Sequence, residues 1–174
     1  MSIHAIVEHM SKRTDGYYKI DKVDTTDVWL TPQSLLDKLG HFDLDPCSPK
    51  EMPYKIADRF YSLENNEDGL MLPWEGRVWL NPPYSNWVPF MKRLKEHNNG
   101  LALIFARTET QGFFDHIWND ANSILFLKRR LKFSRLDGSL GGGSTTPSVL
   151  IAYGENNSEI LENCGLDGKH VFLK

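Results

Sequence analysis

The residues best suited to chemistry in this chain are four in a row, Asn81, Pro82, Pro83 and Tyr84, in the stretch "RVWLNPPYSNW". An amine attached to a heteroaromatic ring is a poor nucleophile, because its lone pair is delocalised into the ring. Two acceptors aimed at its hydrogens would localise that lone pair, and the Asn81 side-chain carbonyl and the Pro82 backbone carbonyl can supply them. The two prolines hold φ at about −65° and stiffen the turn. The Tyr84 ring is then available to stack on the flat substrate ring.

This stretch contains no general base, no activated nucleophile and no metal ligand. The chain has two cysteines, Cys47 and Cys164, and six histidines, and none of them shows the spacing of metal ligands. We therefore expect reduced thiols and no metal. Cys47 is interpreted as a packing residue, because no histidine lies near it in the sequence. The pattern favours transfer of an already activated group to an amine.

The composition favours a single globular domain. The chain has 174 residues with 40% hydrophobic content, enough for one buried core. It has no apolar run of about 18 residues and no basic-then-apolar order at its N-terminus, so we expect a cytoplasmic protein with no membrane partner. The net charge of −3 argues against general attraction to nucleic acid but allows a local basic patch.

Alternating strand and helix patterns indicate the fold. Apolar runs predict strands over 41–45, 77–81, 101–106, 123–127 and 147–154, with a possible further strand at 57–62. Apolar spacing predicts helices over 31–40, 86–100 and 110–121. This order predicts an α/β fold with a mostly parallel sheet and helices on both faces. Asp45 and Asn81 then fall at the carboxyl ends of strands, where such sheets bind ligands.

The order of the motifs resembles that of a known family. "WLTP", "FDLDPCS", "EDGL" and "VWLNPPYS" follow one another, and "LKFSRLDG" and "TTPSVLIAYG" come later. The set is similar to the phage and prophage DNA N-6-adenine methyltransferases, which are Dam-like, from about Trp29 to Tyr153. "NPPY" itself resembles the catalytic motif of the amino-methyltransferases.

The resemblance implies a Rossmann-like, S-adenosylmethionine-dependent methyltransferase fold over residues 28–174, after an N-terminal arm over 1–27. It implies methyl transfer from S-adenosylmethionine to the exocyclic amine of adenine in DNA, with the adenine flipped out of the duplex. If the protein is phage-encoded, its place is the cytoplasm of the host cell.

The resemblance also implies contacts to the methionine end of the cofactor. Thr31 and Pro32 would contact its carboxylate, and Asp45, followed by Pro46, would face its amine. The residues alone leave other interpretations open. Thr31 is also placed to cap a helix with Pro32 at the first helical position, and Asp45 is also typical of a turn.

At the other end of the cofactor, the resemblance implies that Asp68 accepts a hydrogen bond from the adenine amine. Glu64 is a second candidate, for the ribose hydroxyls. An Asp before a Gly is often only a turn residue, and this alternative stays open. The wider methyltransferase pattern has a glycine-rich loop after the first strand, whereas "DPCSPKEMP" has no glycine.

A basic stretch, "KRRLKFSR", forms the candidate DNA contact. Its charged residues are Lys128, Arg129, Arg130, Lys132 and Arg135. Five neutralised phosphates would give a logarithmic salt slope of about −4.5. The alternative is a solvated edge with no partner. The resemblance implies that Phe133 stacks on the second face of the flipped base, and the glycine-rich link over 137–146 is either a segment that orders on DNA or a simple hairpin tip.

Two other functions stay open on the sequence alone. Methylation of an RNA base or of a protein glutamine uses the same amine or amide geometry. A catalytically inactive nucleic-acid-binding module could keep the fold. The recognition sequence and the oligomeric state do not follow from the sequence.

Overall fold

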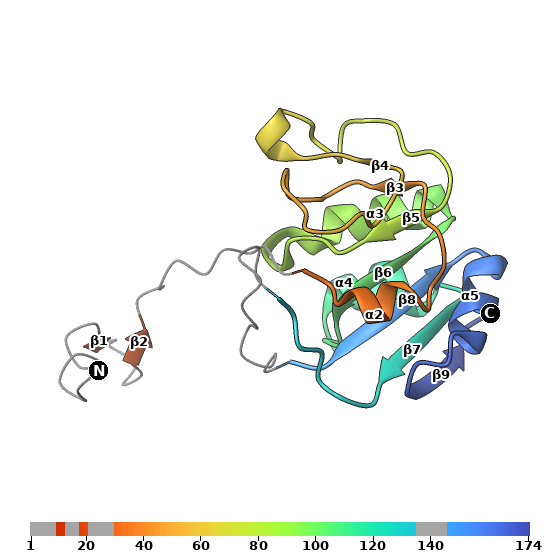
Figure 1. Ribbon diagram of the computed structural model, residues 1–174. Coiled ribbons are helices and arrows are strands. Elements are labelled where there is room, and N and C mark those ends of the chain that lie inside the picture. The colour runs from red at the N-terminus through yellow and green to blue at the C-terminus, as the bar shows by residue number, and fades with distance from the viewer. Residues whose placement is uncertain (1–9, 13–17, 21–29, 135–145) are drawn as a thin grey trace.

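The computed structural model describes residues 10–12, 18–20, 30–134 and 146–174 (Figure 1). The first two ranges are the strands β1 (Met10–Lys12) and β2 (Tyr18–Ile20), which form an antiparallel pair. The rest of the predicted arm over 1–27, and nearly all of the link over 137–146, lie outside the described residues. In the described part of the chain, no helix is long and apolar enough to cross a membrane.

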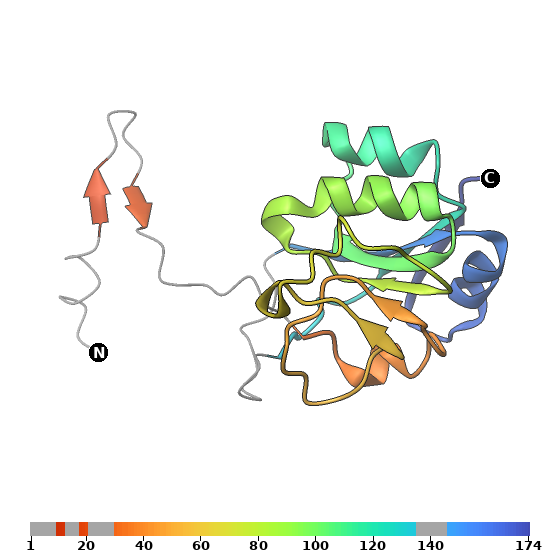
Figure 2. The same cartoon turned by 90° about the horizontal axis from the view of Figure 1, so that it is seen from above.

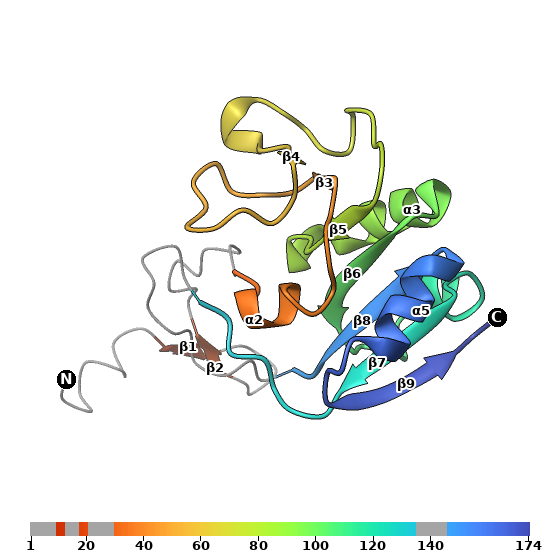
Figure 3. The same cartoon turned by 45° about the vertical axis from the view of Figure 1, so that its right-hand side comes forward.

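Seven strands form one mixed sheet in the order β4-β3-β5-β6-β8-β7-β9 (Figure 3). Their bounds are β3 (Leu44–Asp45), β4 (Arg59–Phe60), β5 (Val78–Leu80), β6 (Gly100–Phe105), β7 (Ser123–Leu127), β8 (Ser148–Tyr153) and β9 (Gly168–Phe172). The four strands from β4 to β6 are mutually parallel, whereas β8, β7 and β9 pair antiparallel.

The prediction of an α/β fold is confirmed, but the predicted mostly parallel pairing holds for only half of the sheet. Strand β8 enters between β6 and β7 in the opposite direction. A parallel neighbour would need a long crossover, usually a helix, whereas antiparallel neighbours need none. The apolar runs of β7 and β8 do not indicate whether a strand is parallel or antiparallel to its neighbours, so the sequence could not predict this pairing.

Helices cover both faces of the sheet, as predicted (Figure 2). Their bounds are α2 (Gln33–Leu36), α3 (Trp87–His97), α4 (Gln111–Phe113), the π-helical turn η3 (Phe114–Trp118) and α5 (Glu155–Asn163), with short 3-10 turns η1 (Leu63–Asn65) and η2 (Tyr84–Asn86). One face carries α3, α4 and η3, and the other carries α2 and α5. The predicted helix over 110–121 is thus α4 continued by η3, while α5 and β9 were not predicted.

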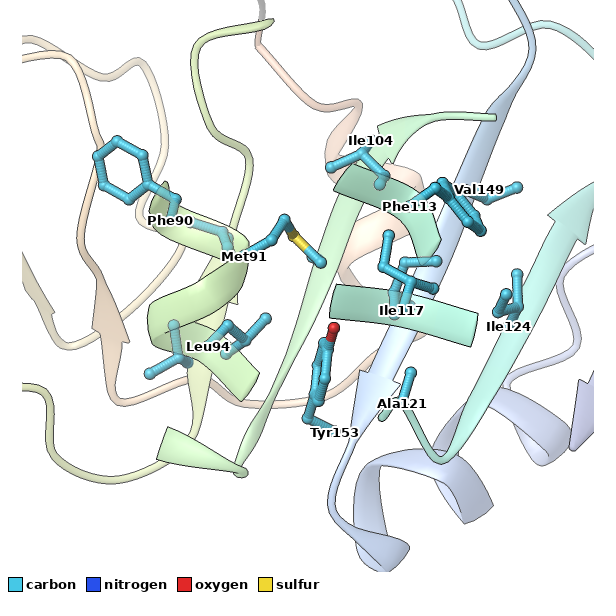
Figure 4. Close-up of a cluster of buried hydrophobic side chains, with 14 of the residues drawn as sticks. Phe90, Met91, Leu94, Ile104, Phe113, Ile117, Ala121, Ile124, Val149 and Tyr153 are labelled. Carbon is cyan, nitrogen blue, oxygen red and sulfur yellow. The ribbon is translucent and has the colours of Figure 1, made fainter. Parts of the chain in front are cut away.

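The sheet separates two apolar clusters. On the first face, Met91 and Leu94 of α3 and Ile117 of η3 pack over the sheet with Ile104 of β6 (Figure 4). Successive residues of a strand point to opposite faces, so in β5 Val78 and Leu80 belong to this cluster. Trp79 belongs to the other cluster, with Leu35, Leu36 and Leu39. The central strands are therefore buried on both sides and hold the ends of β3, β5 and β6 in place.

The connections of β3 create a crevice at the carboxyl edge of the sheet. The chain leaves β3 for β4 on one side and returns to β5 on the other side. Ligands bind α/β sheets at such switch points, outside the carboxyl ends of the strands. The fold thus selects the space between the ends of β3 and β5 as the candidate site.

The opposite edge of the sheet carries a polar cluster that the sequence spacing did not indicate. His41, Asp43 and Asp58 bring ligand-type atoms within 4.8 Å of one another. Lys55 Nζ already lies 2.7 Å from Asp58 Oδ1, and Asp43 Oδ2 accepts a hydrogen bond from the Arg77 backbone. The contacts within the described residues therefore account for this cluster as a set of surface ion pairs.

Candidate active site

A cavity of about 320 Å³ lies at the crevice between β3 and β5. Its walls come from the segments after β3, β4 and β5, from the loop before β5, and from the residues that lead into α2. The main lining segments are 30–31, 45–49, 61–64, 67–70 and 81–84. This volume lies within the range of small-molecule sites, roughly 300–1,000 Å³.

Asp45, at the end of β3, gives the cavity a buried carboxyl group. Its side chain is only 4% exposed. Burial raises its pKa from 3.8 to about 7, although the Cys47 backbone N–H, 3.1 Å from Oδ1, works in the opposite direction. None of the ion pairs among the described residues involves Asp45. A buried carboxylate without a cation is costly, so this position favours a positively charged ligand group.

Cys47 joins the two halves of the site. Its backbone N–H donates to Asp45, and its thiol donates to the Asn81 backbone carbonyl at 3.3 Å. Burial and the nearby Asp45 carboxylate raise the pKa of the thiol. A thiol with a raised pKa is a poor nucleophile. The contacts therefore agree with the interpretation of Cys47 as a packing residue.

Thr31 does not cap α2, contrary to one of its two interpretations. The capping position is Pro32, with φ −56° and ψ 130°, and no side chain makes a capping bond. Thr31 instead lines the cavity, and its backbone carbonyl accepts a hydrogen bond from the Tyr54 hydroxyl. Pro32 has an extended backbone conformation and lies before the first helical turn, so the helix begins at Gln33.

Asp68 lines the cavity and also shapes a turn. Its Oδ1 accepts a hydrogen bond from the Leu70 backbone at 2.9 Å. The next residue, Gly69, lies directly against the loop after β3, because a Cβ atom there would lie 1.7 Å from the Pro46 carbonyl oxygen. The close backbone approach that the glycine-free loop "DPCSPKEMP" lacks is thus provided by Gly69 from a different segment.

Helix α3 fastens the loop that carries Asp68. Arg93 donates hydrogen bonds to the carbonyls of Leu70 and Leu72, and its guanidinium lies 5.1 Å from the centre of the Trp74 ring. The Trp74 indole N–H in turn donates to the Gly69 carbonyl at 2.8 Å. A guanidinium can hold two carbonyls at once in a fixed geometry. The wall at Asp68 is therefore rigidly connected to the helix that follows the Asn81–Tyr84 turn.

The turn Asn81–Tyr84 runs from the end of β5 directly into η2 and α3. Pro83 has φ −58°, close to the value of about −65° that its ring imposes, and ψ 125°. The Tyr84 ring stacks on Phe105, with ring centres 3.7 Å apart and an angle of 10° between the planes. Phe105 ends β6, so the strand next to β5 supports one face of the tyrosine ring.

Several buried polar atoms of cavity-lining residues have no hydrogen-bond partner among the described residues. They are Thr31 Oγ1, Ser62 Oγ, Trp79 Nε1 and Tyr84 Oη. Buried polar groups in proteins are nearly always hydrogen-bonded, so each exception requires an explanation. A polar ligand in this cavity would satisfy such groups, and the donor set fits a ligand with acceptor and hydroxyl groups.

The structure brings most of the predicted site residues together. Those that line the cavity are Thr31, Asp45, Pro46, Glu64, Asp68, Asn81, Pro82, Pro83 and Tyr84. Pro32 lies instead in a neighbouring groove with Arg129 and Arg130. Lys128, Arg129, Arg130 and Lys132 are exposed after β7, and Arg135 lies outside the described residues.

Phe133 is not brought to the cavity. It is only 3% exposed and packs in the apolar cluster with Trp79 and Leu35. The reason is the short antiparallel bridge between Leu30 and Ser134, which carries the chain after β7 back across the core. In this conformation the Phe133 ring does not face the second side of a base bound at Tyr84, so the predicted stacking has no structural support.

Sequence reasoning missed three residues at the site: Ser62, Trp79 and Phe105. Ser62 and Trp79 line the cavity, and Phe105 supports Tyr84. A signal existed for Ser62 and Phe105, because each lies at or next to the end of a predicted strand, at the same edge as Asp45 and Asn81. Trp79 carried no such signal, since a tryptophan within a strand is typical of a core position.

The α/β fold, with a cavity at the strand ends that contains a buried carboxyl group, belongs to a class of folds compatible with a methyltransferase. The chain belongs to the DNA N-6-adenine-methyltransferase (Dam) family, whose sequence profile matches residues 20–159. The resemblance noted from the motifs is thus confirmed.

Two phage proteins, each described as a DNA N-6-adenine-methyltransferase, are similar to this chain. One, from Escherichia phage T1, is 31% identical over 115 residues, which are 60% of this chain and 46% of that protein. The other, from Haemophilus phage HP1, is 30% identical over 116 residues, 61% of this chain and 65% of that protein. The chain thus matches less than two thirds of the length of either relative.

Proposed function

We propose that the protein is a DNA adenine N6-methyltransferase that uses S-adenosylmethionine, with residues 28–174 as a Rossmann-like methyltransferase domain. The observation that carries the proposal is the shared cavity, in which Asp45, Thr31 and Asp68 line the same space as the Asn81–Tyr84 turn. Family membership supports the same reaction.

The cavity residues fit the cofactor. Asp45 offers a buried carboxylate to the methionyl ammonium, and Thr31 offers a buried hydroxyl to the carboxylate. Asp68 lines the same cavity from the loop before β5, where it would accept a hydrogen bond from the adenine amine. When bound, S-adenosylmethionine supplies a methyl group that is already activated by its attachment to a sulfonium.

The Asn81–Tyr84 turn would hold the target adenine. The Asn81 side-chain carbonyl and the Pro82 backbone carbonyl accept the two hydrogens of the exocyclic amine and direct its lone pair toward the cofactor side of the cavity. The chain then needs no general base before attack, because the amine nitrogen is neutral at the outset. Rigid placement of both acceptors is what the two prolines contribute.

Phe105 would support base stacking by holding the Tyr84 ring. One face of that ring rests on Phe105, so the flipped adenine would stack on the other face. We expect Phe105→Leu to lower kcat/KM for DNA roughly three- to tenfold, because an aromatic pair contributes about 0.5–1.5 kcal/mol beyond its buried area. Steady-state kinetics at varied DNA concentration would measure the change.

The matched control is Phe114→Leu, since Phe114 is 51% exposed and does not line the cavity. It should leave kcat/KM for DNA unchanged. Fluorescence of 2-aminopurine at the target position would show whether the base is still flipped. Equal kinetics in Phe105→Leu and the wild-type protein would contradict the supporting role.

The basic residues after β7 would bind DNA phosphates. β7 runs parallel to β6, because both pair antiparallel with β8, so Lys128–Arg130 leave the sheet at the same edge as the cavity. Replacing Arg129 with Met should reduce the salt slope of DNA binding by about 0.9. Titrations at several salt concentrations would measure the slope. The control Lys95→Met removes a cation that pairs with Asp120 shortly before β7, at the opposite edge of the sheet, and should leave the slope unchanged.

Transfer of a labelled methyl group tests the proposed function directly. The protein is incubated with S-adenosylmethionine labelled on the methyl group and with DNA, RNA or protein in separate reactions. Label in DNA that is recovered as N6-methyladenine supports the proposal, whereas label only in RNA or in glutamine assigns the related activities. Sequencing of methylated adenines in DNA from cells that express the protein would then give the sequence context.

A further inference from the structure

Ser62 is a buried hydroxyl at the cavity with no assigned role. It is 1% exposed, lines the cavity, and its Oγ has no hydrogen-bond partner among the described residues. It precedes η1, where a serine would ordinarily cap the turn, yet its side chain makes no capping bond. Leaving a buried hydroxyl unpartnered is costly, so its position requires a partner that enters the cavity.

The backbone around Ser62 connects the two segments that would hold the ends of the cofactor. The N–H of Tyr61 donates to the Asp45 carbonyl at 2.9 Å, and the N–H of Glu67 donates to the Ser62 carbonyl at 3.0 Å. The Asp45 backbone is therefore hydrogen-bonded to Tyr61, the residue before Ser62. Asp68 comes directly after Glu67, which is hydrogen-bonded to Ser62. Ser62 thus lies on the stretch of backbone that links the end of β3 at Asp45 to the loop that carries Asp68.

We infer that the Ser62 hydroxyl binds a ribose hydroxyl of the cofactor. The inference rests on the proposed function, in which Asp45 holds the amino acid end and Asp68 the adenine end. The ribose is the part of the cofactor between those ends, and it carries two hydroxyls. A serine hydroxyl can both donate to and accept from such a group.

We expect Ser62→Ala to weaken ligand binding without destabilising the ligand-free protein. S-adenosylhomocysteine should bind roughly five- to tenfold more weakly, which corresponds to the loss of one hydrogen bond. The thermal midpoint of the ligand-free protein should stay the same or rise, because the variant removes a buried hydroxyl that has no partner there. Isothermal titration and a thermal melt measure the two quantities.

Ser148 supplies a closely matched control. It is also 1% exposed, and its Oγ also has no partner among the described residues, but it lies on β8 and does not line the cavity. Ser148→Ala should therefore match Ser62→Ala in thermal behaviour and leave the affinity for S-adenosylhomocysteine unchanged.

The ribose assignment is tested with the 2′-deoxy and 3′-deoxy analogues of S-adenosylhomocysteine. The wild-type protein should bind one of them more weakly than the parent compound, and Ser62→Ala should lose this preference, because contacting groups give non-additive effects. Equal loss for all three ligands overturns the ribose contact.

The remaining outcomes separate this inference from the proposed function. If wild-type protein binds S-adenosylhomocysteine and Ser62→Ala binds it equally well, Ser62 is not a ligand contact and the proposed function stands. A clear fall in the thermal midpoint of Ser62→Ala without ligand would make the residue structural and also overturn the inference. No binding by the wild-type protein overturns both.

Discussion

Asn81→Ala is expected to abolish detectable methyl transfer while cofactor binding persists. Asn81 lies directly after β5, whereas the contacts proposed for the cofactor come from other segments. Removing one preorganised acceptor or donor at a reacting group typically lowers kcat about 10²–10³-fold. Transfer of label to DNA gives kcat, and isothermal titration with S-adenosylhomocysteine gives the affinity.

The control for Asn81→Ala is Asn156→Ala, which makes the same chemical change at an exposed position of α5. It should keep both the activity and the affinity. Asn81→Asp is informative as well, because it keeps an acceptor oxygen in a similar place. Near-normal activity of Asn81→Ala would exclude the proposed handling of the amine, whatever the cofactor affinity.

The strand ends of the parallel half of the sheet could be predicted because their local patterns agree with the tertiary structure. The strands before Asp45 and Asn81 are short apolar runs, and parallel neighbours bring their carboxyl ends to one edge. The proline pair similarly determines its own backbone conformation. Where the local conformational preference and the tertiary packing favour the same structure, that structure can be predicted from the sequence.

The C-terminal part was missed because its pattern is weak. Helix α5 buries Asn157 and Ser158, so its inward face is partly polar and lacks apolar periodicity. Asn157 is held by a long-range bond, from Arg77 Nε to its Oδ1 at 2.6 Å. Arg77 lies 80 positions before Asn157 in the sequence, so no local pattern indicates this contact. Phe133 illustrates the same limit, since the bridge between Leu30 and Ser134 decides its position.

Asp45→Asn is expected to weaken cofactor binding and to stabilise the ligand-free protein above about pH 7. The pKa of Asp45 is raised from 3.8 to about 7 by burial. An acid with a raised pKa in the fold contributes stability below its unfolded pKa, and this contribution is lost as the pH rises through the folded pKa. One unit of pKa corresponds to about 1.4 kcal/mol, so the buried charge costs the wild-type protein a few kcal/mol at pH 8. Asn removes that cost.

The same carboxylate should make cofactor affinity depend on pH. Binding of an ammonium requires ionised Asp45, so the affinity of the wild-type protein for S-adenosylhomocysteine should fall by up to about tenfold per pH unit below pH 7 and level off above it. Asp45→Asn should bind weakly with a flat profile, whereas Asp37→Asn, at an exposed position after α2, should behave like the wild-type protein. Chemical denaturation and isothermal titration between pH 5.5 and 8 measure both effects.

The two effects of Asp45→Asn have opposite signs, which distinguishes a ligand-binding carboxylate from a structural one. If the carboxylate served mainly to stabilise the fold, its substitution would lower the stability of the protein, because its partners would lose an interaction. If the carboxylate serves to bind a cationic ligand group, it lowers the stability of the ligand-free protein until that ligand binds. If Asp45→Asn proves less stable than the wild-type protein at pH 8, or binds S-adenosylhomocysteine equally well, the carboxylate does not serve the cofactor amine. The site would then need a different cationic partner at the end of β3.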